Sequence, residues 1–176
     1  YHQGLWTMQD EAAQLVSRLL GPRSGERILD ACCGLGGKTT HLAELVGAAE
    51  PATRILGVDI SQRKLELLEE HCLRLGVRCE TRCRDLGELE EEGFQRIPLD
   101  APCSGLGVLR RHPELKWREV ATGAERSSEL VKLQRRLLRR ALGLLAPGGC
   151  LVYAVCTVSP AEGPEQREWI LKEYPE

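Results

Sequence analysis

Two cysteines in this chain follow apolar segments that have the character of buried strands. Residues 100–104 read Asp-Ala-Pro-Cys-Ser, and Cys156 follows the apolar run 150–155. A thiolate is a strong nucleophile, so either Cys103 or Cys156 is a candidate for covalent catalysis, and the other thiol needs a different role. Upstream, residues 30–39 form a glycine-rich turn, where an open α/β sheet would hold a nucleotide-like cofactor. Together these features predict methyl transfer to a pyrimidine carbon.

The thiols and their neighbours fit the chemistry of cytosine. Carbon 5 of that ring is a poor nucleophile. When a thiolate adds at carbon 6, carbon 5 becomes enamine-like and can attack a methyl donor. A base then removes the carbon-5 proton. Asp100 is the candidate for stabilising the charge shift at the ring nitrogen and amino edge, with turn formation as its structural alternative. Lys38 is a candidate for lowering the pKa of the attacking thiol. The other cysteines are expected to be small apolar fillers: Cys32, Cys33, Cys72, Cys79, Cys83 and Cys150.

Glycines 34, 36 and 37 would let the backbone approach a ligand and aim amide groups at it from a helix N-terminus. A P-loop would need glycine where Cys32 stands, and a dinucleotide fingerprint would need glycine where Thr39 stands. The turn therefore fits neither a nucleoside triphosphatase nor a dinucleotide site.

Acidic residues stand at the ends of further predicted strands. Asp59 could accept both hydroxyls of a cofactor ribose, or cap the next helix. Asp85 could contact the edge of an adenine ring, or start a turn. The spacing alone leaves both pairs of alternatives open.

Strands alternate with helices along the chain, which predicts an α/β fold with a mostly parallel, doubly wound sheet. Strands are expected at residues 27–30, 55–59, 77–83, 97–100 and 150–155. Pro98 conflicts with a central strand because it cannot donate a ladder hydrogen bond. The acidic run 88–92 is expected to be a solvated surface.

Helices are expected from apolar positions at helical spacing. The first stripe is Ala12, Leu15, Val16 and Leu19, ended by Gly21 and Pro22, and the second helix covers residues 40–46. The third stripe is Leu65, Leu68, Cys72 and Leu75, ended by Gly76. A long helix is expected to end at residues 146–149. Its inward stripe is Leu130, Leu133, Leu137, Ala141 and Leu144. Its arginines are expected to lie largely outward on a solvated face: Arg135, Arg136, Arg139 and Arg140. A last helix covers residues 166–172.

Composition narrows the class of protein. The 176 residues suit one core, and we expect one catalytic domain over residues 1–176. A net charge of −2 argues against binding nucleic acid through bulk positive charge. Eight scattered cysteines favour a reducing cytoplasm over a disulfide framework, and Cys72, Cys79 and Cys83 lack the paired spacing of a zinc site. No metal and no membrane association are expected, since no apolar run reaches membrane-spanning length.

Taken together, the motifs resemble those of the RNA (cytosine-5) methyltransferases of the NOL1/NOP2/Sun family. The resemblance spans nearly the whole chain, in blocks that follow one another in the order typical of that family. The blocks are residues 9–13, 30–39, 100–108, 110–113, 116–117 and 153–160. It implies a Rossmann-like class I methyltransferase fold that lacks the C-terminal strands and an RNA-binding domain.

The resemblance also implies the roles of individual residues. Cys156 would be the attacking thiolate, and Cys103 would help to resolve the covalent intermediate. The S-adenosylmethionine (SAM) site would comprise Cys32, Cys33, Gly34, Leu35, Gly36, Gly37, Lys38, Asp59, Asp85 and Asp100. The chain departs from the family pattern at Leu35, Pro98 and Val155.

An RNA strand is the expected partner. Basic residues that follow the Asp100 loop could meet its phosphates: Arg110, Arg111, His112, Lys116 and Arg118. Trp117 is expected to pack. The target cytosine should lie in an unpaired region of ribosomal RNA, because stacking covers the ring faces of a paired base. Two alternatives are a catalytically silent cofactor- or RNA-binding module in ribosome assembly, and a DNA cytosine methylase that depends on Cys103.

Overall fold

The computed structural model describes residues 1–47 and 52–175 of the chain. The chain divides into two compact units. The first consists of Tyr1–Asp100 with Arg140–Val152, and the second of Ala101–Arg139 with Tyr153–Glu176.

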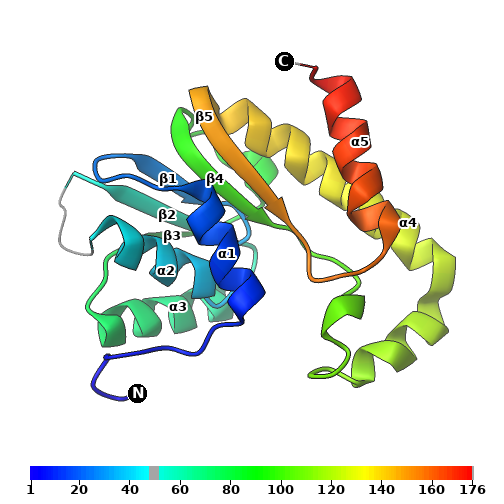
Figure 1. The fold of residues 1–176 in the computed structure, drawn as a ribbon, viewed down its shortest axis with the longest axis horizontal. Helices are drawn as coiled ribbons and strands as arrows, with labels where there is room; N and C mark the ends of the chain where they lie inside the picture. The colour runs from blue at the N-terminus through cyan, green and yellow to red at the C-terminus, as the bar shows by residue number, and fades with distance from the viewer. Residues whose placement is uncertain (48–51, 176) are drawn as a thin grey trace. The chain divides into compact units, whose positions relative to one another are not determined.

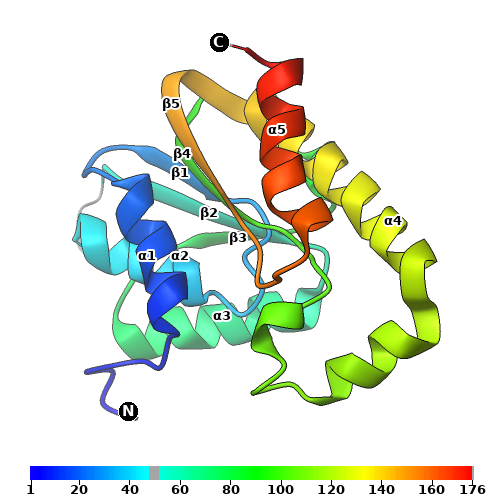
Figure 2. The same cartoon turned by 45° about the vertical axis from the view of Figure 1, so that its right-hand side comes forward.

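The first unit is built on a five-stranded sheet of order β3-β2-β1-β4-β5 (Figure 1; Figure 2). The strands are β1 Arg27–Asp30, β2 Arg54–Asp59, β3 Glu80–Cys83, β4 Phe94–Asp100 and β5 Leu145–Ala154. β1 pairs in parallel with β2 and β4, and β2 pairs in parallel with β3. The strand order reverses between β1 and β4, so this is the switch point at which such sheets bind ligands. The predicted parallel α/β sheet is confirmed.

Three helices of the first unit lie side by side along the sheet (Figure 1). They are α1 Glu11–Leu20, α2 Gly37–Val46 and α3 Gln62–Leu75. The predicted first helix is confirmed and ends before Gly21. Its apolar stripe is not the buried face, because Leu15 and Leu19 are 52% and 73% exposed while Ser17 and Leu20 are buried. The helix contacts α2 and β4 and so turns a different side inward. In α3 the predicted stripe is confirmed, with Leu65, Leu68 and Cys72 buried.

Two strands differ from their predicted bounds. β3 begins at Glu80 because the chain first makes a turn at Gly76, where the Val77 amide donates to the Cys72 carbonyl at 3.0 Å. β5 begins at Leu145, directly after the long helix, so residues 146–149 lie within the strand.

The conflict predicted at Pro98 does not arise. β4 is an interior strand, and the Pro98 carbonyl accepts the Ala31 amide at 3.1 Å. Proline lacks only the donor, so it can still join the ladder through its acceptor.

An apolar cluster fills the space between the sheet and the helices of the first unit. Its buried members are Leu20, Ile28, Cys33, Leu42, Ala43, Val46, Ile55, Leu65, Leu68, Cys72 and Val77. The glycine turn therefore rests on a packed core, which fixes its backbone.

The second unit holds most of α4 Glu114–Leu144, together with η2 Leu106–Val108, η3 Pro160–Glu162 and α5 Pro164–Glu173. The prediction that the arginines of α4 form a solvated face is only partly right. The guanidinium groups of Arg135 and Arg139 lie 5.0 and 4.9 Å from the ring centroid of Trp169, and Arg139 also pairs with Glu173 at 3.0 Å. These contacts join α4 to α5. Arg140, in the first unit, donates to the Leu89 carbonyl.

Candidate functional site

Three carboxylates lie where strands of the first unit end. Asp30, Asp59 and Asp100 are the last residues of β1, β2 and β4. Asp30 is fully buried, and its Oδ2 accepts Thr39 Oγ1 at 2.7 Å. Burial raises the pKa of Asp30 to about 6, against the hydrogen bond from Thr39, which lowers it. Several acidic groups therefore meet at the ligand-binding edge of a parallel sheet.

Asp59 braces the glycine turn. Its Oδ2 accepts the Gly34 amide at 3.0 Å, and its Oδ1 accepts the Ser61 amide at 2.9 Å at the start of α3. An ionised carboxylate has about four lone-pair positions, so these two bonds leave room for hydroxyl donors of a ligand. The N-cap of α3 is Ser61, so Asp59 is not the cap of this helix, and its contact with a ribose stays a prediction.

The glycine turn needs its glycines for packing as well as for ligand approach. Gly36 has φ 82°, and a Cβ there would lie 2.0 Å from Leu68 Cδ1. Gly34 has φ 55° and open space around the position of a Cβ. α2 begins at Gly37, three residues earlier than predicted, so its first amide groups belong to the turn.

Lys38 pairs with Asp100: Nζ lies 2.5 Å from Oδ2. The lysine is the more buried partner, with a side chain 12% exposed against 39% for Asp100. The ammonium group therefore faces a carboxylate at the end of β4, and its predicted help to a thiol stays a prediction.

Asp85 lies two residues beyond the end of β3. Its Oδ1 accepts the Gly87 amide at 2.8 Å and caps η1 Leu86–Glu88, which agrees with the turn-forming alternative.

Next to Asp59, Ile60 is 75% exposed. An exposed apolar side chain at this edge offers a surface for a flat ring. The sequence prediction missed Ile60, although the position of this residue directly after the strand-end Asp59 was the available signal.

Two cysteines of the glycine turn are unsuited to attack. Cys33 is buried in the apolar cluster. Burial first, and then the nearby carboxylates led by Asp30, raise the pKa of the Cys32 thiol to about 12. Both remain protonated near neutral pH, as expected of structural cysteines.

In the second unit the two candidate thiols lie together. Cys103 Sγ and Cys156 Sγ are 3.2 Å apart, and Cys156 is the more exposed. The hydrogen bond to Cys156 and partial burial raise the pKa of the Cys103 thiol. Either sulfur can donate in this hydrogen bond. A Cys103 thiol that keeps its proton would donate it to the Cys156 sulfur and so stabilise a thiolate there.

The loops that carry the thiols are fastened to each other. Ser104 Oγ and Thr157 Oγ1 are 2.8 Å apart, and the Gly107 amide donates to the Cys156 carbonyl at 3.0 Å. A Cβ at Gly107 would lie 2.9 Å from that carbonyl oxygen, so a larger residue would push the loops apart.

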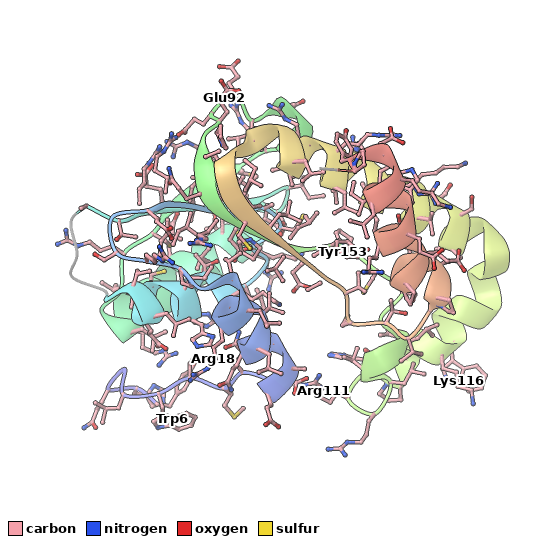
Figure 3. The ribbon with its side chains drawn as sticks, turned by 45° about the horizontal axis from the view of Figure 1, so that its top comes forward. Trp6, Arg18, Glu92, Arg111, Lys116 and Tyr153 are labelled. Carbon is pink, nitrogen blue, oxygen red and sulfur yellow. The ribbon has the colours of Figure 1, made fainter. Side chains whose placement is uncertain are left out.

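A buried polar network stands behind these loops, and the sequence prediction missed it. Glu162 Oε2 accepts the Ser104 amide and Gln134 Nε2, both at 2.9 Å, and Gln134 also donates to the Pro102 carbonyl at 2.9 Å. Tyr153, labelled in Figure 3, donates its hydroxyl to the Glu162 carbonyl at 2.8 Å. Glu162 and Gln134 are 1% and 0% exposed. Gln134 stands four residues after Leu130 and three before Leu137, both on the predicted inward stripe, and this spacing was the available signal.

The predicted RNA contacts lie on an exposed segment of the second unit. Figure 3 labels Arg111 and Lys116 there, and Arg110 and His112 are also exposed. The side chain of Arg118 lies outside the described part of the chain. The prediction that Trp117 packs is wrong, because this side chain is 72% exposed. Its ring is available to a base.

Within residues 1–47 and 52–175, no three His, Cys, Asp or Glu side chains lie close enough together to hold a metal ion. In the same residues, no helix has both the length and the apolar character needed to cross a membrane.

Residues 17–176 match the family described as 16S rRNA methyltransferase RsmB/F. The ribosomal RNA small subunit methyltransferase B of Klebsiella pneumoniae is 41% identical over 100% of this chain, which spans 40% of that relative. The solved structure of NSun6 from Pyrococcus horikoshii with SFG is similar at a TM-score of 0.85 and 31% identity, over 98% of this chain and 43% of that one. A methyltransferase homolog from the same organism is similar at a TM-score of 0.83 and 30% identity, over 98% and 53%.

Proposed function

Because the chain belongs to the RsmB/F family of 16S rRNA methyltransferases, we propose that it transfers the methyl group of SAM to carbon 5 of a cytosine in ribosomal RNA. The observation that carries this proposal is the pair of thiols with sulfurs 3.2 Å apart. Methylation of an oxygen or of an amino nitrogen needs no thiol nucleophile, whereas the carbon-5 reaction uses one. The chain spans about 40% of the curated relatives that it matches, so the activity of the whole protein is part of the proposal.

Cys156 is the nucleophile in this proposal. Its sulfur forms a bond to carbon 6 of the ring, and the electrons of the ring double bond pass to carbon 5, which takes the methyl group. A base then removes the carbon-5 proton, the double bond re-forms, and the bond between carbon 6 and sulfur breaks. Cys103 assists that last step, which is consistent with a thiol that keeps its proton beside the Cys156 sulfur.

The carboxyl edge of the sheet is the proposed cofactor site. SAM, when bound, would supply the methyl group, its methyl–sulfur bond would break, and it would leave as S-adenosylhomocysteine. It carries positive charge, a ribose diol and an adenine ring. The acidic groups Asp59 and Asp100 suit the diol and the charge, and exposed Ile60 offers an apolar surface for the adenine. The proposed set is completed by Asp85 and by Cys32, Cys33, Gly34, Leu35, Gly36, Gly37 and Lys38. The similar NSun6 structure contains SFG, a SAM analogue.

Ribosomal RNA would enter as an unpaired strand, because only an unstacked cytosine exposes both ring carbons to a thiol. The exposed cations Arg110, Arg111, His112 and Lys116 would contact its phosphates, with Trp117 available for stacking. We place the reaction in the cytoplasm, in keeping with eight cysteines that form no disulfide in the described part of the chain.

The test incubates the protein with SAM and RNA that contains 5-fluorocytosine. Fluorine cannot leave carbon 5 as a proton does, so the adduct should survive denaturation in the wild type and be absent from Cys156→Ala. Cys103→Ala should accumulate adduct even on ordinary RNA. An adduct that persists in Cys156→Ala and disappears in Cys103→Ala would move the nucleophile to Cys103. SAM binding without adduct or methyl transfer in the whole protein would favour the catalytically silent module.

A further inference from the structure

A second pair of thiols lies in the first unit. Cys72 is in the last turn of α3, and Cys79 stands directly before β3. Their sulfurs are 3.0 Å apart, and neither forms a disulfide. This separation is shorter than that between Cys103 and Cys156, so the two sulfurs are already in contact.

The turn between the two cysteines holds them in this position. Gly76 has φ 68°, and its amide and that of Val77 donate to carbonyls of the last turn of α3. This is the closed arrangement that commonly ends a helix, and its hydrogen bonds fix the backbone that joins the cysteines. The sulfurs are therefore held together by the local fold, and closing a covalent bond would require only a small movement.

The two thiols differ in how readily they lose a proton. The hydrogen bond between them lowers the pKa of Cys72, although burial opposes this effect. The same hydrogen bond, followed by burial, raises the pKa of Cys79. Either sulfur can donate in this hydrogen bond. With the proton on Cys79, Cys72 is the better nucleophile.

Both thiols line a cavity of about 670 Å³. Its lining also includes Glu69, Leu73, Val77, Arg78 and Glu80. A peroxide molecule is little larger than water, so the cavity gives it access to Cys72, although that side chain is only 6% exposed overall.

We propose that Cys72 and Cys79 form a peroxide-sensitive pair that closes to an intrachain disulfide. The Cys72 thiolate attacks one oxygen of hydrogen peroxide; a sulfur–oxygen bond forms, the oxygen–oxygen bond breaks, and the departing hydroxide takes a proton to become water. Cys79 then loses its proton, its sulfur bonds to that of Cys72, and the sulfur–oxygen bond breaks to release a second water. Two thiols are oxidised and one peroxide is reduced.

The test oxidises the reduced protein with hydrogen peroxide, blocks the remaining thiols with N-ethylmaleimide and maps tryptic peptides by mass spectrometry. Residues 65–74 contain Cys72, and residues 79–82 contain Cys79, on separate peptides. We expect these two peptides joined, lighter by two hydrogen atoms than their sum, and separated again by dithiothreitol. Closing so short a loop should also raise the melting temperature by roughly 5 °C.

Two substitutions test the roles of the individual cysteines. Cys79→Ser should leave Cys72 as a sulfenic or sulfinic acid, because the resolving thiol is gone, whereas Cys83→Ser should leave the linked peptide unchanged. Recovery of both wild-type peptides singly, or of Cys72 linked to another cysteine, would overturn the proposal. This mapping uses the unmutated protein, so it decides the question even if a variant fails to fold.

Discussion

Glu162 Oε2 lies 2.9 Å from the backbone nitrogen of Ser104, the residue that follows Cys103. The same carboxylate oxygen accepts a hydrogen bond from Gln134 of α4, and the side chain is almost completely buried. A single carboxylate from the segment after Cys156 thus fixes the backbone beside Cys103. Its position suggests that it sets the distance between the two thiols.

We expect Glu162→Gln to lower stability by about 1–3 kcal/mol, because a neutral amide replaces the carboxylate that accepts two buried hydrogen bonds. It should also slow formation of the 5-fluorocytosine adduct about tenfold or more, since small misplacements of reacting groups are costly. Urea unfolding and adduct kinetics measure the two effects. Exposed Glu165→Gln is the matched control. A loss of stability with an unchanged adduct rate would make Glu162 a structural residue only.

Asp59→Ala should remove saturable SAM binding, because the substitution deletes both the ribose acceptor and the brace on the Gly34 amide. Calorimetry of the purified protein measures the affinity. The exposed Glu70→Ala on α3 should bind SAM as the wild type does. Undiminished binding by a folded Asp59→Ala protein would remove this residue from the cofactor site.

Asp30 should make stability depend on pH. Burial raises its pKa to about 6 from an ordinary 3.8, so the folded state keeps a proton that the unfolded state has lost. Stability should therefore fall as pH rises through this window, from about pH 4 to about pH 6. Relative to Asp30→Asn, in which this position does not titrate, the free energy of unfolding of the wild type should fall by up to about 3 kcal/mol across the window.

Urea unfolding of both proteins at several pH values measures this difference. Any constant effect of the amide cancels in the comparison. Parallel stability profiles for the two proteins would show that Asp30 titrates normally.

Gly36→Ala should be more damaging than Gly34→Ala. Both glycines have positive φ, which costs an alanine about 1–2 kcal/mol, but only at Gly36 would the new Cβ also meet Leu68. That clash adds overpacking of about 1–3 kcal/mol. Chemical denaturation of the two variants measures the loss of stability in each. Equal losses would mean that α3 accommodates the added methyl group with no loss of stability.

Trp117→Ala should change stability by less than about 0.5 kcal/mol, because the ring is largely exposed. If the ring stacks on a base, RNA affinity should fall about fivefold or more. Fluorescence titration with single-stranded RNA at fixed salt measures it. Trp117→Phe should restore most of the affinity, whereas a large loss of stability in the alanine variant would return Trp117 to a packing role.

Much of the fold was predictable, because alternation of apolar runs with turn residues marks a parallel sheet. Gly21 and Gly76 end their helices as predicted, each with positive φ. The buried side of α1 was not predictable, since leucines occupy more than one face and only tertiary contacts decide between them. Local patterns also could not locate the beginning of β5, where a strand follows the helix without an intervening turn.

The site was predictable where a residue type has few alternatives at its position. Asp59, Asp100 and the two thiols fall at strand ends or just beyond them, as predicted. The roles of Gln134 and Glu162 were not, because their partners are backbone groups distant in sequence. Trp117 was misjudged because one aromatic residue in a basic segment gives no pattern from which to infer burial.

Neither compact unit is a single stretch of chain, and this determines the order in which they can form during synthesis. The sheet unit ends at residue 152, so its edge strand β5 emerges from the ribosome only after residues 101–139 of the other unit. Until then β4 has no neighbour on one side and presents an open strand edge, which is prone to mispairing. Helix α5 must follow before Trp169 can meet the arginines of α4. Nascent chains stalled after residue 139 should therefore engage chaperones, whereas release should follow once β5 is available.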